Sequence, residues 1–440
     1  MNGMKISRLI VQTLVVVAIA ISFVLSFLIL TNNSRYQMQP KTDVAEKKSS
    51  KQNVVQKEEL YSPSQIIWND GTDQRLVYNN KHNVVKSVQK DMSTWKFGKV
   101  SVLSKNNTEK YKKFVNSKDS LQLFYPLQMS VSYYGDLLKQ DNLSKEDKYM
   151  FNRVLFHFDH KDKNIYLGND RNHTVYKLSV NSGSSEEIVK LLKNTDISLK
   201  INLVVRDKTV SVDYVDHVVM NTYSYLVTKQ EDNNYVSNLL GSNNISTRQS
   251  GDTSTYSANS YQRLVSDSKK NQLTYYDYSK DDLPKSKTEM LNNGYKLINK
   301  INSPLSNAKL AYVDWKNRVL VYREYVEGFP TFKKSDIGAV KVSFQDSGTI
   351  AQFSNKVIQV PIPSDQKPVT LKNTAEIIED LKNGGYTIDK IEDIDLGYEW
   401  TIDKDNSDVV DLSPSYFIRI GNKWSTLSEL VGVSDRIGGS

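Results

Sequence analysis

The sequence predicts an α+β protein, in which one N-terminal transmembrane helix precedes a multidomain extracytoplasmic region of mixed α-helices and antiparallel sheets. Three observations support this prediction. Residues 9–30 carry no charged side chain, and as a helix of roughly 33 Å they would cross a bilayer core of about 30 Å. Beyond residue 61, helical spacing and strand-like alternation both occur. Near the C-terminal end a helix-then-sheet module is predicted twice.

The apolar segment is predicted to be a retained signal anchor. Its apolar core exceeds the roughly 7–15 residues of a secretory signal, and residues 31–36 offer no Ala-x-Ala-like cleavage site. Lys5 and Arg8 precede it with no acidic residue beside them, so the positive-inside rule places the N-terminus in the cytoplasm. We expect a single-pass protein of the cell membrane with the bulk of the chain extracytoplasmic. The alternative, a cleaved signal, would leave a mature N-terminus near residue 31.

One face of the predicted anchor carries small residues. Ala18, Ser22 and Ser26 recur every four positions, which places them on the same side of a helix. Small residues at this spacing let another transmembrane helix approach closely, and serine hydroxyls can bond across the gap. These three residues are the predicted site of helix packing; the alternative is that they face lipid.

Composition divides the chain into six expected segments. Residues 31–60 are polar and charged, with apolar residues scattered without a period, which is typical of a disordered linker. The part beyond the linker is too long for a single core. The expected segments are a cytoplasmic tail (1–8), the transmembrane anchor (9–30), the disordered linker (31–60), and N-terminal (61–218), middle (219–368) and C-terminal (369–440) extracytoplasmic domains.

The N-terminal domain is expected to mix helices and strands. Val84, Val88 and Met92 have helical spacing. Pro126 lies in a run of strand formers and should mark a break or an edge. The predicted elements are helices over 83–92 and 186–194, strands over 121–134 and 174–180, and a hairpin of 154–158 with 164–167.

An internal repeat organises the prediction for the rest of the chain. The stretch 291–301 (LNNGYKLINKI) is similar in sequence to 381–391 (LKNGGYTIDKI). Each follows an amphipathic helix, and Gly294 and Gly385 are expected to end those helices. The predicted helices are 233–240, 287–292 and 375–382, and the predicted strands are 223–228, 257–264, 272–278, 309–315, 319–325, 339–344, 349–353, 394–401 and 416–420.

Composition restricts the function classes. The 440 residues include no cysteine, so disulfides and thiolate chemistry are excluded. The formal net charge is +8. Because the anchor would place this charge outside the cell, we expect no nucleic-acid partner, and anionic lipid or wall polymer is the more fitting counterpart. A basic surface without a ligand is the alternative.

No motif indicates catalysis. His157 and His160 form the only local histidine cluster, and in a strand they would point to opposite faces, which is wrong for one metal. Carboxylates gather at 389–395, where we expect a solvated polar loop. We therefore predict a non-enzyme with no catalytic, cofactor-binding or metal-binding residue, while a carboxylate-pair hydrolase stays open. Ser-x-x-Lys occurs five times without an accompanying Lys-Thr-Gly, as expected by chance, at Ser87, Ser93, Ser266, Ser306 and Ser364.

The layout of the chain resembles the YycH regulatory proteins of Gram-positive bacteria. A short basic tail, one anchor helix, a polar tether and a cysteine-free α+β ectodomain of this size are shared with that family. The resemblance extends over essentially the whole chain. The more specific signatures are Pro63–Ile66, the run Val319–Phe332, Gly397–Trp400 and Pro414–Ile418.

The resemblance implies a role in signal transduction. It implies a membrane-anchored, non-enzymatic regulator of an essential cell-wall two-component sensor histidine kinase, called YycG or WalK. Such a regulator would act through transmembrane-helix and ectodomain contacts with the kinase and with YycI, a second single-pass protein whose ectodomain is similar to the C-terminal part of YycH. The alternative is an extracytoplasmic module that binds anionic cell-wall polymer or lipid.

Overall fold

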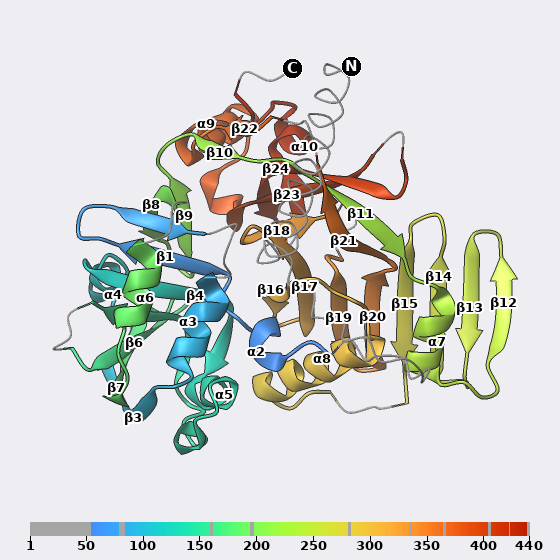
Figure 1. Ribbon diagram of the computed structural model, residues 1–440, viewed down its shortest axis with the longest axis horizontal. Coiled ribbons are helices and arrows are strands. Elements are labelled where there is room, and N and C mark those ends of the chain that lie inside the picture. Colours follow the sequence, from blue (N-terminus) through green and yellow to red (C-terminus); the bar gives the residue numbers. More distant parts are fainter. Residues whose placement is uncertain are drawn as a thin grey trace, which may run out of the picture. The chain divides into compact units, whose positions relative to one another are not determined.

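The computed structural model describes residues 54–78, 84–158, 162–193, 198–279, 283–333, 337–363, 367–403, 406–421 and 423–437. All of these residues belong to one compact unit. The fold is mixed α and β with a predominance of sheet, as the sequence predicts, and two large sheets contain most of the strands (Figure 1). No helix of the described ranges is long and apolar enough to span a membrane.

The first sheet contains nine strands from the N-terminal half of the chain. Its order is β3-β7-β6-β5-β4-β1-β2-β8-β9, and the paired strands are antiparallel. Helices α3 (Val84–Met92), α4 (Thr108–Val115), α5 (Val131–Leu137) and α6 (Glu186–Lys193) accompany it. The strands are β1 Gln65–Asn69, β2 Gln74–Val77, β3 Lys96–Ser104, β4 Ser120–Ser130, β5 Met150–His157, β6 Asn164–Asn169, β7 Thr174–Ser182, β8 Ser198–Val205 and β9 Val210–Tyr214.

The second sheet contains fourteen strands from residue 223 onward, and its central path runs β12-β13-β14-β15-β20-β19-β17-β18-β23-β24-β11-β21. The strands are β11 Tyr223–Lys229, β12 Ser246–Ser250, β13 Thr253–Ser257, β14 Gln262–Asp267, β15 Gln272–Asp277, β16 Ala308–Asp314, β17 Val319–Val326, β18 Phe329–Phe332, β19 Val340–Gln345, β20 Gly348–Ser354, β21 Lys356–Ile362, β23 Asp393–Ile402, β24 Val409–Ile420 and β25 Lys423–Thr426. Its helices are α7 Asp232–Leu240, α8 Lys287–Ile301, α9 Thr374–Asn383 and α10 Leu427–Val431.

Strands on both sides of residue 368 share this sheet, because β11 pairs with both β21 and β24. Strand β18 also pairs with β23, in parallel. A separate ribbon of β10 (Val218–Met220) and β22 (Val369–Leu371) links the same two parts of the chain. The division into middle and C-terminal domains stays a prediction.

Most local elements of the N-terminal half agree with the sequence prediction. Helices α3 and α6, the β5–β6 hairpin and strand β7 lie where they are expected. The expected strand over 121–134 is correct only to residue 130, where Ser130 caps helix α5 by accepting a hydrogen bond from the Tyr133 amide. Pro126 lies in the expected break, since the β4–β5 register shifts between Phe124 and Met129.

The expected strand over 257–264 is wrong. Residues 258–261 form the turn between β13 and β14, and Asn259 Oδ1 accepts hydrogen bonds from the amides of Tyr261 and Gln262. An asparagine side chain that binds the backbone two and three residues ahead favours a turn over a strand. The apolar residues on either side belong to different strands.

The expectation of a disordered linker is wrong at its C-terminal end. Helix α2 covers Lys57–Leu60, and the side chain of Leu60 is completely buried. The physical reason is that Leu60 and Tyr61 enter the core together, which fixes the turn of chain before them. Linker residues 31–53 lie outside the described residues.

The two copies of the internal repeat differ at the position where each helix ends. Helix α9 ends at Asn383, close to the expected position, and Gly385 adopts a φ of 88°. Helix α8 instead continues through Gly294 to Ile301. A Cβ on Gly294 would lie 2.5 Å from Leu320 Cδ1 and closer still to the Tyr322 hydroxyl. Gly294 therefore lets the helix approach the sheet. Both helices are followed by antiparallel strands, β16 and β17 after α8 and β23 and β24 after α9.

Replacing Gly294 by alanine tests this role. In a helix without tertiary contact, glycine to alanine stabilises by about 1 kcal/mol. Because the new methyl group would meet Tyr322 and Leu320, we expect Gly294→Ala to lower the free energy of unfolding by roughly 1–3 kcal/mol in denaturant titrations. Lys296→Ala, exposed on the same helix, is the control and should change it by less than about 0.5 kcal/mol. Stabilisation by Gly294→Ala would contradict the close packing.

Candidate functional site

The segment that spans the end of the predicted linker and the residues after it lies between the two large sheets (Figure 1). Residues 55–64, called the joining segment below, contain helix α2 and lead into β1. Leu60, Tyr61, Ser62 and Pro63 are all buried. The joining segment is therefore part of the core and not a surface connection.

Tyr61 is the centre of this arrangement. Its hydroxyl donates a hydrogen bond to the Leu291 carbonyl oxygen in α8 at 2.5 Å and lies 3.0 Å from the Tyr322 hydroxyl in β17. Its ring packs edge-on against Tyr133 in α5, with the centroids 5.8 Å apart. Burial raises the pKa of Tyr61 well above its usual value, so the hydroxyl keeps its proton. One side chain thus contacts elements that accompany both sheets.

Lys309 makes the second contact of this kind. Its ammonium donates a hydrogen bond to the Pro63 carbonyl oxygen at 3.2 Å and lies 5.2 Å from the Tyr325 ring centroid. The residue is only 5% exposed. Burial lowers the pKa of Lys309 to about 8. Burying an ammonium away from water is costly, and the Pro63 carbonyl and the Tyr325 ring offset part of that cost.

Polar contacts hold the rest of the joining segment on both sides. The Val55 amide donates to Asn299 Oδ1 in α8 at 2.9 Å, and Asn299 Nδ2 donates to the Val55 carbonyl at 3.3 Å. Toward the first sheet, Lys57 pairs with Asp136, and the Ser64 amide donates to the Phe124 carbonyl at 2.9 Å. The first described residues are therefore fixed to a helix of the second sheet before the chain enters the first.

The joining segment can couple the position of the preceding chain to the folded part, but its side chains are not arranged for catalysis. Burial keeps the Tyr61 hydroxyl protonated. The Lys309 ammonium is 5% exposed and donates to the Pro63 carbonyl oxygen, so no substrate can reach it in this arrangement. The arrangement fixes the place at which the preceding chain is attached. Its candidate role is therefore to hold the preceding chain in position relative to both sheets.

The sequence-predicted site residues Ala18, Ser22 and Ser26 lie outside the described residues, as does the whole predicted anchor. Their packing role and the membrane localisation therefore stay predictions.

The histidines form no metal site in the part of the chain that the structure describes. His157 Nδ1 lies 3.0 Å from Asp162 Oδ2, which also accepts a hydrogen bond from Tyr166. His160 lies outside the described residues. Within the described ranges, no three histidine, aspartate or glutamate side chains are placed to hold a metal.

A buried ionic network in the first sheet is structural. Arg153 in β5 donates to both carboxylate oxygens of Asp170, at 3.1 and 3.0 Å. Asn152 and Tyr111 also donate to that carboxylate, Tyr111 at 2.5 Å. Both charged side chains are almost fully buried. Because the partners satisfy each other, no group is left to attack or bind a substrate.

Of the carboxylates at 389–395, only Glu392 lies in a loop as expected. Asp389 lies in a 3-10 helix, and Asp393 and Asp395 lie in strand β23. Arg419 pairs with Glu392 at 3.5 Å and with Asp393 at 3.7 Å. Burial, and then the neighbouring Asp393, raises the pKa of Asp395 to about 7. The group is an ion-pair cluster on the second sheet.

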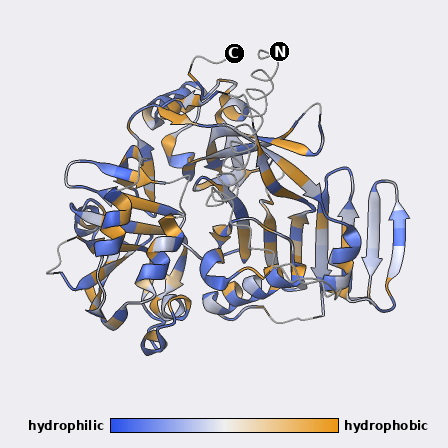
Figure 2. Ribbon diagram, viewed as in Figure 1, coloured by the Kyte–Doolittle hydropathy of each residue, from blue (hydrophilic) through white to orange (hydrophobic). Residues whose placement is uncertain are grey.

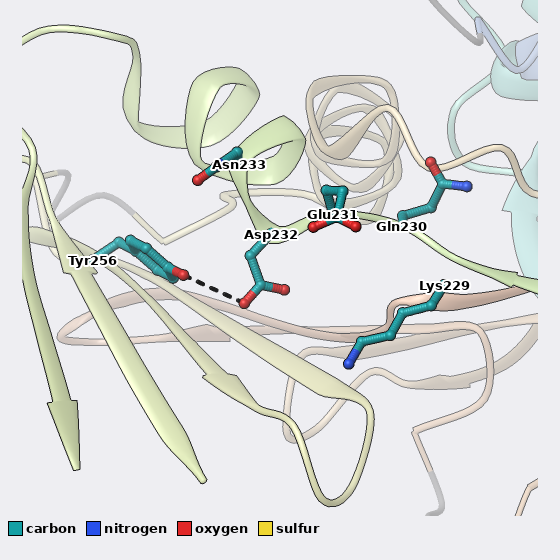
Figure 3. Close-up of a pocket in the computed structure, with 6 residues that line it drawn as sticks. All are labelled: Lys229, Gln230, Glu231, Asp232, Asn233 and Tyr256. Carbon is teal, nitrogen blue, oxygen red and sulfur yellow. Dashed lines mark hydrogen bonds between the residues drawn. The ribbon is translucent and has the colours of Figure 1, made fainter. Parts of the chain in front are cut away.

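A small open pocket lies where α7 begins (Figure 3). Residues 229–233 and Tyr256 line it, and the Tyr256 hydroxyl lies 3.5 Å from Asp232 Oδ2. Its walls are polar and mostly side chains of one short segment. It offers neither the apolar enclosure nor the convergent polar groups of a typical small-molecule site.

Sequence reasoning missed the joining segment. Tyr61 is predicted as the first folded residue, but its partners Leu291 and Tyr322 are more than 200 residues away, and no local pattern indicates such pairing. Two signals were present in retrospect: a glycine, Gly294, at a buried helix position, and a lysine, Lys309, in an apolar strand.

Comparisons with known proteins agree on one family. The model of the YycH protein N-terminal domain matches residues 9–197, and that of the YycH protein C-terminal domain matches residues 212–431. The crystal structure of YycH from Bacillus subtilis has the same fold, with a TM-score of 0.69 and 16% sequence identity, covering 85% of this chain and 97% of that chain. No curated protein matches.

Tyr61→Phe tests the joining segment. The variant keeps the ring but removes the bonds to Leu291 and Tyr322, so we expect the free energy of unfolding to fall by roughly 1–3 kcal/mol. The control is Tyr261→Phe, because the Tyr261 side chain is 60% exposed and lies far along the chain from the joining segment. If denaturant titrations gave the same change in the free energy of unfolding for both substitutions, the Tyr61 hydroxyl would make no specific contribution to stability.

Lys309 predicts a pH dependence of stability. The folded protein releases the Lys309 proton near pH 8, whereas an unfolded chain releases it near pH 10.4. Between these values the unfolded state binds more protons, so stability rises with pH. We expect the free energy of unfolding of the wild type to rise by roughly 3 kcal/mol relative to Lys309→Met from about pH 7.5 to about pH 10.5. Parallel pH profiles would contradict the buried ammonium.

Proposed function

This chain belongs to the YycH family, and on that basis we propose that it is a membrane-anchored, non-enzymatic regulator of a sensor histidine kinase, YycG or WalK, that governs cell-wall metabolism. The two family domains together extend over most of the chain and support a regulatory role in general. The described residues present buried, mutually satisfied polar networks in place of a catalytic constellation. A binding function therefore fits the fold better than a reaction.

The proposed partners are the kinase and a YycI-like single-pass protein. The anchor would pack against their transmembrane helices through Ala18, Ser22 and Ser26. The ectodomain would contact the partner ectodomains. Regulation then requires that the protein bind one state of the kinase better than the other, because only differential affinity shifts an equilibrium.

Family membership carries this proposal, and the fixed start of the described chain bears on how the folded part would reach its partners. Val55, Tyr61 and Pro63 are bonded to elements of the second sheet. If residues 31–54 are a flexible tether, their root-mean-square span is roughly 27 Å. The folded part would then stay within a short distance of the anchor, which raises its effective concentration for any partner in the same membrane.

Substitution of the small anchor face tests the proposal. We expect Ala18→Leu, Ser22→Leu and Ser26→Leu together to lower recovery of a sensor kinase and a YycI-like protein after in-cell crosslinking of the full-length chain. The reduction should be roughly five- to tenfold, in keeping with about 1–2 kcal/mol for helix packing and bonding. Mass spectrometry of the purified complexes measures it.

The matched control changes the opposite helix face, Thr13→Leu with Ala20→Leu and Val24→Leu. Recovery should be unchanged in this variant. If both variants lowered recovery of the partners equally, the cause would be the added side-chain volume in the anchor and not the loss of the small face. Recovery of no kinase from the wild type would refute the regulatory role.

A further inference from the structure

Part of the second sheet has one covered face and one open face. In strands β14, β15, β20 and β19, alternate residues such as Leu264, Leu273, Phe353 and Val342 are buried. They belong to the core cluster that includes α7 and α8 residues, and both helices lie on that side of the strands (Figure 1). The residues between them point the opposite way and keep intermediate or high exposure. This second side is called the open face below.

Strand register aligns polar residues in a row across the open face. Each residue of the row is the direct partner of the next on the neighbouring strand, from β12 through β13, β14, β15 and β20 to β19. The row, called the transverse row below, consists of Arg248, Thr255, Val265, Thr274, Gln352 and Lys341. With neighbouring strands about 4.8 Å apart, its five steps extend over roughly 24 Å.

Arg263 lies in the next row, beside Val265 and opposite Tyr276. Its guanidinium is 4.5 Å from the Tyr276 ring centroid and 6.0 Å from that of Tyr278. Such stacking holds the charged group in place while its N–H donors stay available. An oriented arginine is better prepared for an anionic ligand than a freely moving one.

The open face carries uncompensated positive charge. Arg248, Arg263 and Lys341 form no ion pair with any residue in the described ranges. The nearest carboxylate of the face in β14, Asp267, is paired with Lys270 at 3.0 Å. Three cations therefore surround a strip of threonine hydroxyls and a glutamine amide, which can donate hydrogen bonds to phosphate oxygens.

The composition of the open face identifies the kind of ligand. The centre of a protein–protein interface is usually apolar and aromatic, whereas β12 and β13 carry neutral to hydrophilic residues along their length (Figure 2). Cations distributed over roughly 24 Å match a ligand that repeats its negative charge.

We propose that the open face binds a linear phosphodiester polymer, which lies across the strands along the transverse row and is held by Arg248, Arg263 and Lys341. This activity is independent of the kinase partners proposed above. Binding releases counterions, so it weakens as salt rises.

The test uses the full-length chain in a non-ionic detergent and immobilised poly(glycerol phosphate). We expect the combined variant Arg248→Gln, Arg263→Gln and Lys341→Gln to bind at least roughly tenfold more weakly, with a flatter dependence on salt. The matched control removes the same charge from exposed lysines of the first-sheet region, Lys99→Gln with Lys105→Gln and Lys110→Gln. It should retain wild-type affinity, and unchanged thermal melting of both variants shows that the fold is intact.

Three results would overturn the proposal. Equal weakening in the two variants would show a general effect of net charge. Absence of wild-type binding at low salt would exclude the polymer. Binding to vesicles containing phosphatidylglycerol without binding to the free polymer would assign the face to a membrane surface. If the wild type bound the polymer but recovered no kinase in the crosslinking experiment, only the proposed regulatory role would be contradicted.

Discussion

The buried hydroxyl of Tyr61 is the contact on which the arrangement of the described chain depends. A phenol in an apolar core must keep its proton and find an acceptor, and Leu291 in α8 supplies that acceptor. Tyr322 and Tyr133 enclose the same side chain from β17 and α5. Gly294 makes room for Tyr322 because a side chain at that position would collide with it. These contacts fix the positions of α5, α8 and β17 relative to Tyr61, although they lie far apart in the sequence.

Sequence patterns correctly predicted the elements that are determined by interactions between residues close together in the chain. The apolar spacing of Val88 and Met92 and the amphipathic pattern over 375–382 identify helices because the helix itself imposes these requirements. Patterns failed where the partner lies far along the chain. Leu60 is at the end of a polar stretch and becomes core only because the second sheet covers it. Gly294 looks like a helix end and is instead a contact point, since the same residue type serves both purposes.

The candidate site shows the same division. The predicted anchor face follows from helical periodicity alone, and it lies outside the described residues. The joining segment could not be derived from the sequence, because Lys309 and Pro63 are 246 positions apart and each is unremarkable locally. The transverse row could not be derived from the sequence either, because Arg248 and Lys341 come to lie on one face only through the register of six strands.

Shared fold and low identity together indicate where the specific function of this chain must lie. At 16% identity to the YycH crystal structure from Bacillus subtilis, the chain keeps its architecture while most side chains differ. A core tolerates such change if its volume and patterning are maintained, so a shared core gives the fold without specifying a partner. Recognition must then reside in exposed residues, where substitutions cost little stability. On the second sheet the covered face is constrained by α7 and α8, and the open face is free to acquire a ligand.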